Sequence, residues 1–240
     1  MINDKIQERT VELIGVNNIE RFQKVKIAVI GLGGVGGTAL MSLARSGFLN
    51  FYLVDSDYVE HSNLNRQILF SSSDIGLPKV EQATKYLLNL SKNIKVDSHF
   101  EKVSETNIEN LLDGQKVDFI VDAIDDINGK LAIIKYSIER KIPAIISLGM
   151  GNRLDPHRVE ITTLDKTNYD PLAKKLRAEC RKNNLDLKEI TAICSTEQPL
   201  KKNKSPSSMI MVPSSAGLLI CYHVINHFLK EEKKEGLKND

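Results

Sequence analysis

Hydrophobic and polar positions follow two different periods along the chain, and their alternation predicts an α/β protein. Short apolar runs are typical of buried strands. Such runs occupy residues 27–30, 51–54, 119–123 and 144–148, and residues 94–100 alternate apolar with polar side chains. Apolar side chains recur at helical spacing in residues 38–46, 80–90, 107–112 and 131–140. Strands and helices alternating at such short spacing predict a doubly wound, mainly parallel, Rossmann-like sheet.

The two ends of the chain add elements to this core. Residues 1–24 have the pattern of amphipathic helices, which Gly15 divides in two. Residues 159–164 alternate again and predict another strand, with an antiparallel direction as one option. Asp170-Pro171 begins a charged helix that extends to about residue 183, since proline suits a first helical position. The remaining predictions are an irregular stretch over 186–208, an apolar helix over 216–229 and a solvated tail over 231–240.

These elements predict one domain over residues 1–240. Its parts are N-terminal helices (1–24), a sheet core (25–150) and a strand and helix extension (151–240). A single large α/β domain of this length buries a substantial core.

A glycine cluster follows the first strand and indicates a nucleotide site. Its glycines are Gly31, Gly33, Gly34, Gly36 and Gly37. Glycines there let the backbone turn tightly and approach a phosphate, and the next helix offers free N–H groups. Asp55 lies 24 residues after Gly31, at the end of the second strand, where an acid would meet a ribose hydroxyl. The pattern alone leaves NAD, ATP and a simple packing turn as alternatives.

The polar run after Asp55 favours ATP over NAD. The sequence DSDYVEHSNLNRQ concentrates acids, amides and an arginine where a dehydrogenase has no need of them. Arg66 and Lys79 can hold phosphates, Asn63 can donate an amide hydrogen bond, and Asp125 or Asp57 can hold Mg²⁺. Catalysis in such a site is positioning and charge stabilisation, with no protein nucleophile.

Composition excludes several classes of protein. The chain is 41% hydrophobic and 27% charged with a net charge of +2, which is ordinary for a globular protein. It has no signal peptide pattern and no apolar run near the roughly 20 residues that span a bilayer, so we expect no membrane association. Cys180, Cys194 and Cys221 are widely spaced, which suits the reducing cytoplasm and gives no disulfide framework. Cys194 is the cysteine that falls in a predicted loop.

Four motifs in order resemble one enzyme superfamily. GLGGVGG, DSDYVEHSNLNRQ, IGLPKVEQA and VDAIDD are similar to the ATP-dependent adenylating enzymes of the ubiquitin-activating-like (ThiF, MoeB and HesA) type, over about residues 8–150. The resemblance implies that Asp55 binds the ribose, that Asp125 holds Mg²⁺, and that Arg9 reaches the ATP of a partner subunit in a homodimer. Arg21 is the alternative to Arg9. The resemblance also places the ATP among Gly31, Gly33, Gly34, Gly36, Asp57, Asn63, Arg66, Gln67 and Lys79, with Arg66 and Lys79 on the phosphates.

Motifs in the second half of the chain resemble one particular family within this superfamily. Asp155-Pro156, the run 164–167, the stretch 170–173 and the stretch 195–197 resemble the tRNA threonylcarbamoyladenosine dehydratases. In that family, ATP activates the carboxylate of the threonylcarbamoyl side chain on the adenosine 3′ of the anticodon. A neighbouring group of the same side chain then closes a five-membered ring, with formal loss of water. Activators of ubiquitin-like sulfur carriers, the alternative, commonly have CxxC pairs for zinc, and this chain has none.

A tRNA partner predicts a local excess of basic residues. Between Lys166 and Lys204 the chain has ten Lys or Arg against five Asp or Glu. A solvated helix face with a polar loop gives the same pattern, and the family resemblance favours the tRNA interpretation. The predicted tRNA contacts are Arg153, Lys174, Lys175, Arg177, Arg181, Lys182, Lys201, Lys202 and Lys204. An NAD-dependent oxidoreductase is the third hypothesis, and a sulfur-transfer partner protein is left open.

Overall fold

The fold is built on one seven-stranded sheet. The structure is a computed structural model that describes residues 5–200 and 207–236. Within these residues the strand order is β3-β2-β1-β4-β5-β7-β6, and all neighbouring strands are parallel except β6 and β7. The strands are β1 (Lys26–Ile30), β2 (Asn50–Val54), β3 (Lys95–His99), β4 (Phe119–Asp122), β5 (Ala144–Ser147), β6 (Val159–Thr163) and β7 (Thr191–Ser195). The predicted doubly wound α/β fold and the antiparallel option for residues 159–164 are confirmed.

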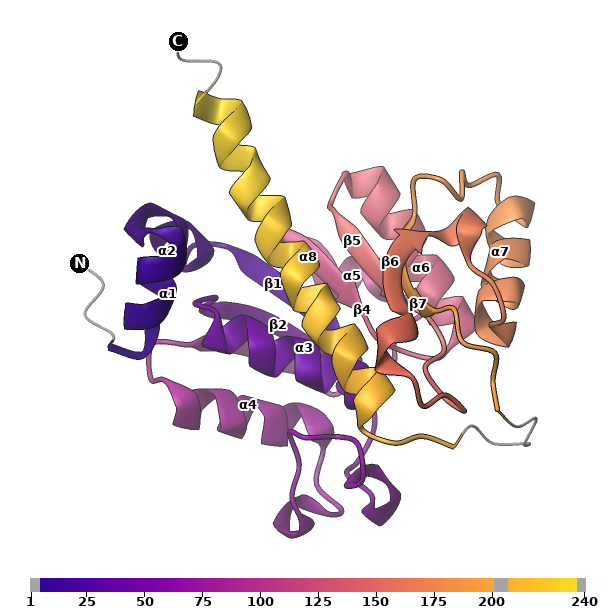
Figure 1. The fold of residues 1–240 in the computed structure, drawn as a ribbon, viewed down its shortest axis with the longest axis horizontal. Helices are drawn as coiled ribbons and strands as arrows, with labels where there is room; N and C mark the ends of the chain where they lie inside the picture. Colours follow the sequence, from indigo (N-terminus) through magenta and orange to yellow (C-terminus); the bar gives the residue numbers. More distant parts are fainter. Residues whose placement is uncertain (1–4, 201–206, 237–240) are drawn as a thin grey trace.

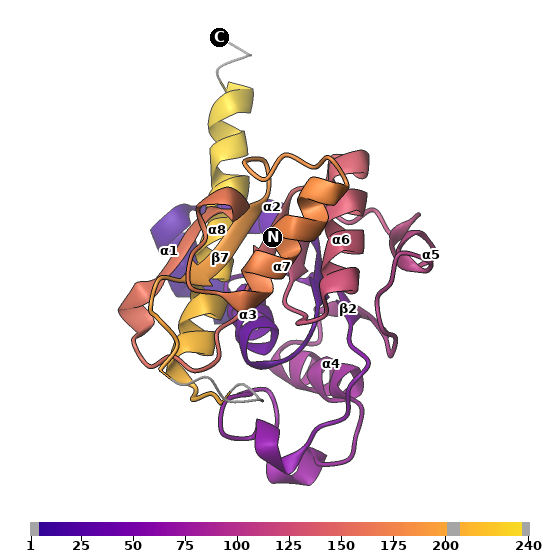
Figure 2. The same cartoon turned by 90° about the vertical axis from the view of Figure 1, so that its right-hand side faces the viewer.

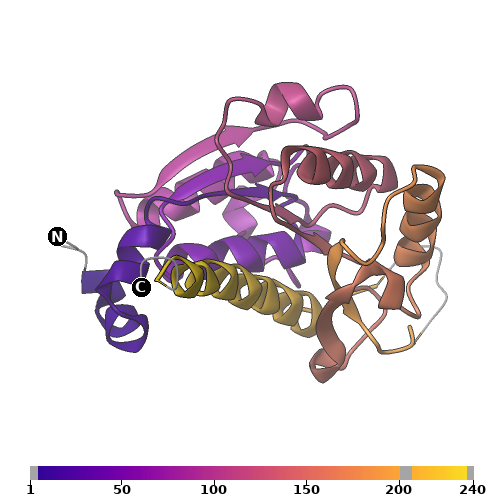
Figure 3. The same ribbon diagram turned by 90° about the horizontal axis from the view of Figure 1, so that it is seen from above.

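Helices cover both faces of the sheet (Figures 1 and 3). α3 (Gly34–Arg45), α4 (Lys79–Leu90) and α8 (Met211–Gly236) pack on one face. α5 (Ile108–Leu112), α6 (Ile127–Arg140) and α7 (Pro171–Lys182) pack on the other. In β1 the side chains of Ile27 and Val29 join the first layer, while Ala28 and Ile30 join the second, as the two-residue period of a strand requires.

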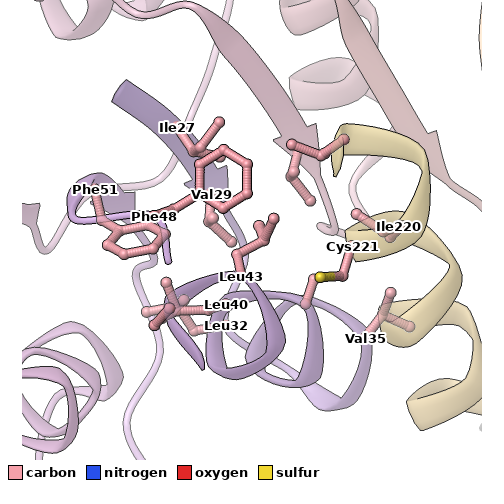
Figure 4. Close-up of a cluster of buried hydrophobic side chains, with 14 of the residues drawn as sticks. Ile27, Val29, Leu32, Val35, Leu40, Leu43, Phe48, Phe51, Ile220 and Cys221 are labelled. Carbon is pink, nitrogen blue, oxygen red and sulfur yellow. The ribbon is translucent and has the colours of Figure 1, made fainter. Parts of the chain in front are cut away.

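The first layer contains the larger core cluster, seen in Figure 4 around Phe48 and Leu43. α8 lies against α3 there because Gly217 has no side chain: a Cβ at that position would lie 2.6 Å from Thr38 Cβ and 2.7 Å from the Val35 carbonyl oxygen. α8 begins at Met211, five residues before the predicted start, and continues to Gly236. The predicted tail over 231–240 is therefore wrong for residues 231–236, and residues 237–240 lie outside the described part.

Two further elements differ from the sequence prediction. α3 begins at Gly34, four residues before the predicted start. Glycines ordinarily weaken a helix, but those in the first turn of α3 are needed for close packing against neighbouring segments. β7 lies inside the stretch predicted to be irregular. It joins the sheet between β5 and β6, where Ile146 is paired with Ala192 and Ile161 with Ile193.

The N-terminal helices confirm the division at Gly15. α1 (Glu8–Ile14) and α2 (Val16–Phe22) meet at this glycine, whose φ of 85° is unfavourable for other residues. The Gln7 side chain donates a hydrogen bond to the Arg45 carbonyl oxygen (3.1 Å), and the Phe22 ring stacks on Phe48. Both contacts are at the C-terminal end of α3. The N-terminal helices therefore lie at the end of α3 opposite to the glycine turn (Figure 1).

Candidate functional site

The predicted nucleotide residues meet where the strand order reverses. From β1 the chain moves outward to β2 and β3, whereas β4 and β5 lie on the other side of β1. Ligands of such sheets bind in the crevice at this switch point, beyond the carboxyl ends of the strands. The glycine turn follows β1 and the loop 123–126 follows β4, so both border that crevice.

Glycine is required at two positions of this turn. Gly31 has a φ of 93°, and a Cβ on it would lie 2.7 Å from the backbone carbon and oxygen of Ala123. A Cβ on Gly36 would lie 1.8 Å from the Gly31 carbonyl oxygen. The turn therefore closes on itself and against the loop after β4, and no larger residue fits.

The turn leaves the first amides of α3 available to a ligand. Gly33 is the N-cap residue and provides no side-chain cap. The first backbone hydrogen bond of the helix runs from the Gly37 N–H to the Gly33 carbonyl oxygen. The N–H groups of residues 34–36 consequently have no acceptor within the helix. Together with the dipole of a 12-residue helix, they form a site for an anion.

Asp55 connects the turn to the end of β2. It is 8% exposed, and its Oδ2 accepts a hydrogen bond from the Leu32 N–H (2.6 Å) while Oδ1 accepts from the Asp57 N–H (2.8 Å). Burial raises the pKa of this carboxyl, and Lys79 and the two backbone N–H groups act against the shift. Asp55 thus fixes the glycine turn and still has acceptor capacity for a hydroxyl group.

Lys79 and Asp57 form an ion pair beside this carboxylate. The Lys79 Nζ lies 2.7 Å from Asp57 Oδ2, and the Lys79 side chain is 5% exposed while that of Asp57 is 65% exposed. Lys79 is the first residue of α4, so its backbone is fixed by the helix. The structure therefore holds a buried cation at the site, and its present partner is an exposed carboxylate.

The segment after Asp57 lies over the glycine turn. A Cβ on Gly34 would lie 3.2 Å from the Arg66 carbonyl oxygen, and one on Gly33 would lie 3.9 Å from Gln67 Nε2. Gln67 is buried, and its Oε1 has no hydrogen-bond partner among the described residues. Gln67 thus packs at the edge of the turn with one polar atom left without a protein partner.

Arg66 and Asn63 make local contacts in the structure. The Arg66 Nη1 donates to the Ser62 carbonyl oxygen (2.6 Å) and to Asn65 Oδ1 (3.1 Å). Asn63 is buried, and its Oδ1 accepts from the Glu60 N–H (3.1 Å) at the start of the short helix η2 (His61–Asn63). Asn63 thus shapes the loop, while the half-buried Arg66 keeps further N–H groups for an anion.

Asp125 is exposed on the loop after β4. The loop is fixed on both sides, because Ala123 contacts Gly31 and Asp126 caps α6 by accepting a hydrogen bond from the Gly129 N–H (2.8 Å). Asp125 is therefore presented at the switch point by a defined backbone. Among the described residues no group of three or more His, Cys, Asp or Glu could hold a metal ion by itself.

A buried ion pair supports this loop from beneath, and the sequence alone did not identify it. Lys130 and Asp122 are both fully buried, with their charged atoms 3.0 Å apart, and Lys130 also donates to the Ser147 carbonyl oxygen. Asp122 in turn accepts a hydrogen bond from the Ile124 N–H (3.1 Å). Burial raises the pKa of Asp122, and Lys130 acts in the opposite direction. The pair joins β4, β5 and α6 directly under the candidate site.

The structure does not bring Arg9 to this site. Arg9 is exposed on α1, at the opposite end of α3 from the glycine turn. A 12-residue helix spans roughly 18 Å, so Arg9 of one chain does not reach the turn of the same chain.

The predicted tRNA residues divide into three groups. Lys174, Lys175 and Arg181 are exposed on α7, where Lys182 pairs with Glu179 (2.7 Å). Arg177 on the same helix donates to the Thr167 carbonyl oxygen (2.7 Å). Lys201, Lys202 and Lys204 lie outside the described residues.

Arg153 requires a correction. It is 3% exposed, so it is not available to a tRNA. Its guanidinium donates hydrogen bonds to carbonyl oxygens that come from four points of the chain, namely Gly149, Gly151, Tyr169 and Glu197. Arg153 therefore holds together the segments that follow β5 and β7, which no local sequence pattern reveals.

The cysteines are all free and buried. Cys194, expected in a loop, lies on β7, and burial raises the pKa of its thiol to about 11. Its interior position in a strand leaves it no access to a substrate. In the described part of the chain, no helix has the length and apolar character needed to cross a membrane.

Comparisons with known proteins identify relatives over nearly the whole chain. The tRNA threonylcarbamoyladenosine dehydratase of Bacillus subtilis is 33% identical to this chain, over 94% of the chain and 95% of the relative. The enzyme of the same description from Escherichia coli is 32% identical, over 82% of this chain and 76% of the relative.

The fold is also shared with a solved structure. The structure of E. coli tRNA N6-threonylcarbamoyladenosine dehydratase in complex with AMP has a TM-score of 0.91 and 28% identity, and covers 98% of this chain and 99% of that one. Residues 7–238 match the ThiF family. This chain therefore belongs to the ThiF family.

Proposed function

We propose that this protein uses ATP to activate the carboxylate of N6-threonylcarbamoyladenosine in tRNA and to cyclise that side chain with formal loss of water. The observation that carries the proposal is the similarity to a tRNA threonylcarbamoyladenosine dehydratase over 94% of this chain. It extends beyond the nucleotide-binding half into the segment after Gly151, where activators of different substrates would differ.

The residues at the switch point fit ATP. The N–H groups at the start of α3 have no acceptor within the helix, and the Gln67 side chain lies beside the same turn. Asp55 has acceptor capacity for a ribose hydroxyl beside the same turn. The related E. coli enzyme has been solved with ATP and with AMP.

Charge at the site suits a triphosphate. In the proposed complex, Lys79 and the free N–H groups of Arg66 bind phosphate oxygens, and Lys79 leaves its exposed partner Asp57. Asp125 is the carboxylate that would hold Mg²⁺, which takes one or two carboxylates together with phosphates and water. Bound there, Mg²⁺ would neutralise charge on the phosphates.

The proposed reaction has two displacement steps. A carboxylate oxygen of the substrate attacks the α-phosphorus of ATP, the bond to the β-phosphate oxygen breaks, and pyrophosphate leaves. A neighbouring group of the same side chain then attacks the activated carbonyl carbon and loses its proton, and AMP leaves as the ring closes. The nucleophiles belong to the substrate, so the protein needs to supply only position and charge. The buried state of all three cysteines is consistent with this.

The test is nucleoside mass analysis of tRNA that carries the threonylcarbamoyl group, after incubation with the protein, ATP and Mg²⁺. We expect a nucleoside lighter by one water, and AMP formed only when that tRNA is present. Alkaline work-up must be avoided because it would open the ring. Wild-type protein that leaves the tRNA unchanged would refute the proposal.

Two other results would favour the alternative functions. Pyrophosphate exchange that depends on a carrier protein ending in Gly-Gly would favour the sulfur-carrier alternative. Tight NAD binding without ATP binding would favour an oxidoreductase.

Asp125→Ala tests the metal assignment. We expect the fold to be retained and turnover to be lost, since the Asp125 side chain is exposed and Asp126 caps α6 in its place. Glu105→Ala is the matched control, because it removes an exposed carboxylate whose partner is Lys135 on α6. Turnover that survives in Asp125→Ala would reject the role in Mg²⁺ binding.

We also propose that the protein works as a homodimer in the cytoplasm, where its three free cysteines remain reduced. A sulfur-transfer protein as a further partner is a separate proposal. Co-purification of such a protein with the ATP-loaded form of this protein would test it.

A further inference from the structure

Tyr169 combines an exposed side chain with an unfavourable backbone conformation. Its φ is 55°, and it is the one aromatic among the five described non-glycine residues with positive φ. Bulky residues rarely adopt this left-handed conformation, because the Cβ crowds the backbone. The residue is also 56% exposed, so burial of the side chain does not compensate for the backbone. Such a residue is retained only if the surrounding structure holds it, and outliers of this kind cluster at functional sites.

The surroundings hold the Tyr169 backbone from both sides. The buried Arg153 donates to the Tyr169 carbonyl oxygen (3.0 Å), and the same Nη1–Nη2 fork binds the Gly149 carbonyl oxygen (2.6 Å). The next residue, Asp170, accepts a hydrogen bond from the Gly149 N–H (2.7 Å) and caps α7 through the Leu172 N–H (2.8 Å). Tyr169 is thus fixed against Gly149, just beyond the carboxyl end of β5.

This position is at the same edge of the sheet as the ATP site. β5 is separated from β1 only by β4, so the ends of β1 and β5 lie roughly 10 Å apart at the usual strand spacing. Tyr169 also lies two residues before α7 (Figure 2). Lys174 and Lys175 on this helix are exposed. The backbone of Tyr169 therefore lies between the carboxyl end of β5 and the basic helix.

The other exposed aromatic side chains are placed differently. Tyr58 and Phe100 pack against each other with ring centroids 5.0 Å apart and planes tilted by 59°, so each is partly covered by the other. Tyr222 is on α8, on the layer that covers one face of the sheet. For Tyr169, no contact with another ring is found among the described residues, and the residue is 56% exposed.

We propose that Tyr169 is the platform on which an unpaired base of the tRNA anticodon loop stacks, next to the adenosine that reacts. This inference rests on the proposed function. Proteins that read single-stranded RNA loops splay the bases and stack them on aromatic side chains. A rigidly held tyrosine fixes the position of one base, and so of the neighbouring adenosine relative to the α-phosphate. Arg153, which does not touch the substrate, is then a positioning residue for Tyr169.

Three substitutions separate stacking from structure. Tyr169→Phe keeps the ring, and we expect affinity for the substrate tRNA close to that of the wild type. Tyr169→Ala removes the ring, and we expect the dissociation constant for this tRNA to rise roughly tenfold. Tyr169→Gly also removes the ring, but glycine adopts positive φ freely. We therefore expect the same loss of tRNA affinity as in Tyr169→Ala, together with a higher Tm than that of Tyr169→Ala. The affinity for ATP should be unchanged in all three.

A tRNA anticodon stem-loop with 2-aminopurine beside the modified adenosine gives a direct readout. We expect its fluorescence to be quenched on binding to the wild type and to Tyr169→Phe, but not on binding to Tyr169→Ala or Tyr169→Gly. Wild-type affinity or wild-type quenching in Tyr169→Ala would overturn the inference. Failure of the proposed function would instead appear as no cyclisation by the wild type, with the binding series still measurable.

Discussion

At the scale of single residues, the glycines of the turn differ sharply in what they tolerate. A Cβ on Gly36 would meet the Gly31 carbonyl oxygen at 1.8 Å, whereas a Cβ on Gly33 would meet only Gln67 Nε2 at 3.9 Å. All glycines of the cluster look equivalent in the sequence. The structure shows that some are required by the fold and that others leave space where a ligand would lie.

Gly36→Ala should therefore unfold more easily than the wild type. The turn must shift away from the clash, and overpacking of this kind costs about 2 kcal/mol or more in the free energy of unfolding. Urea denaturation followed by circular dichroism measures the difference. Gly33→Ala is the matched control, with an expected free energy of unfolding close to that of the wild type. Equal stability of the two variants would contradict the packing described for Gly36.

Arg153 shows at the same scale why some roles cannot be predicted from sequence. A cation near a glycine-rich strand end is a reasonable candidate for binding a polyanion. Its four acceptors, however, are carbonyl oxygens spread from Gly149 to Glu197, and these meet only after the chain has folded. The pair of Asp122 and Lys130 was missed for the same reason, since burial and not spacing defines it.

At the scale of elements, the periodic segments were predictable and β7 was not. The helices and parallel strands between residues 26 and 147 have strong periods that local patterns reveal. β7 is a five-residue strand between polar segments, and its partners β5 and β6 are far from it in sequence. Its stability comes from these partners, so a local pattern carries little information about it.

The burial of the three cysteines within strands and helices predicts how their thiols react. Cys180, Cys194 and Cys221 are buried, and burial raises the pKa of each thiol to about 11. The folded state favours the neutral thiol, so the resulting stabilisation is complete below the ordinary pKa near 9 and is lost as the pH rises towards 11. We expect no alkylation by iodoacetamide at pH 8 in the native protein and reaction of all three thiols in urea. Fast labelling of Cys194 in the native protein would contradict its burial.

The basic face of α7 makes a second prediction at this scale. Lys174 and Lys175 are exposed, whereas Lys182 is paired with Glu179. Replacing Lys174 and Lys175 with alanine should weaken tRNA binding and lower the slope of affinity against salt concentration, by about one per phosphate contact that is lost. Lys182→Ala is the control and should change the slope less. An unchanged slope in the double variant would place the tRNA surface elsewhere.

At the scale of the whole molecule, the parallel topology gathers the site. Asp55, Asp125 and Gly149 are far apart in sequence, yet each follows a parallel strand and therefore reaches the same edge of the sheet. This much could be deduced from the order of strands and helices alone. Arg9 is the exception, because α1 precedes β1 and lies at the amino ends of the strands (Figure 1).

The location of Arg9 gives the homodimer proposal a decisive test. If Arg9 acts on the ATP of a partner subunit, Arg9→Ala and Asp125→Ala proteins should each be inactive alone but active when mixed and allowed to exchange subunits. In a mixed dimer, the site with an intact Asp125 receives Arg9 from the other subunit. Equal mixing makes half of the dimers mixed, each with one complete site, so we expect about a quarter of the wild-type rate in a twofold symmetric dimer. If Arg9 acted within its own chain, each mixed dimer would contain one defective residue per site and the mixture would remain inactive. Repeating the experiment with Arg21→Ala distinguishes the two arginines, because only the residue that crosses the interface gives complementation.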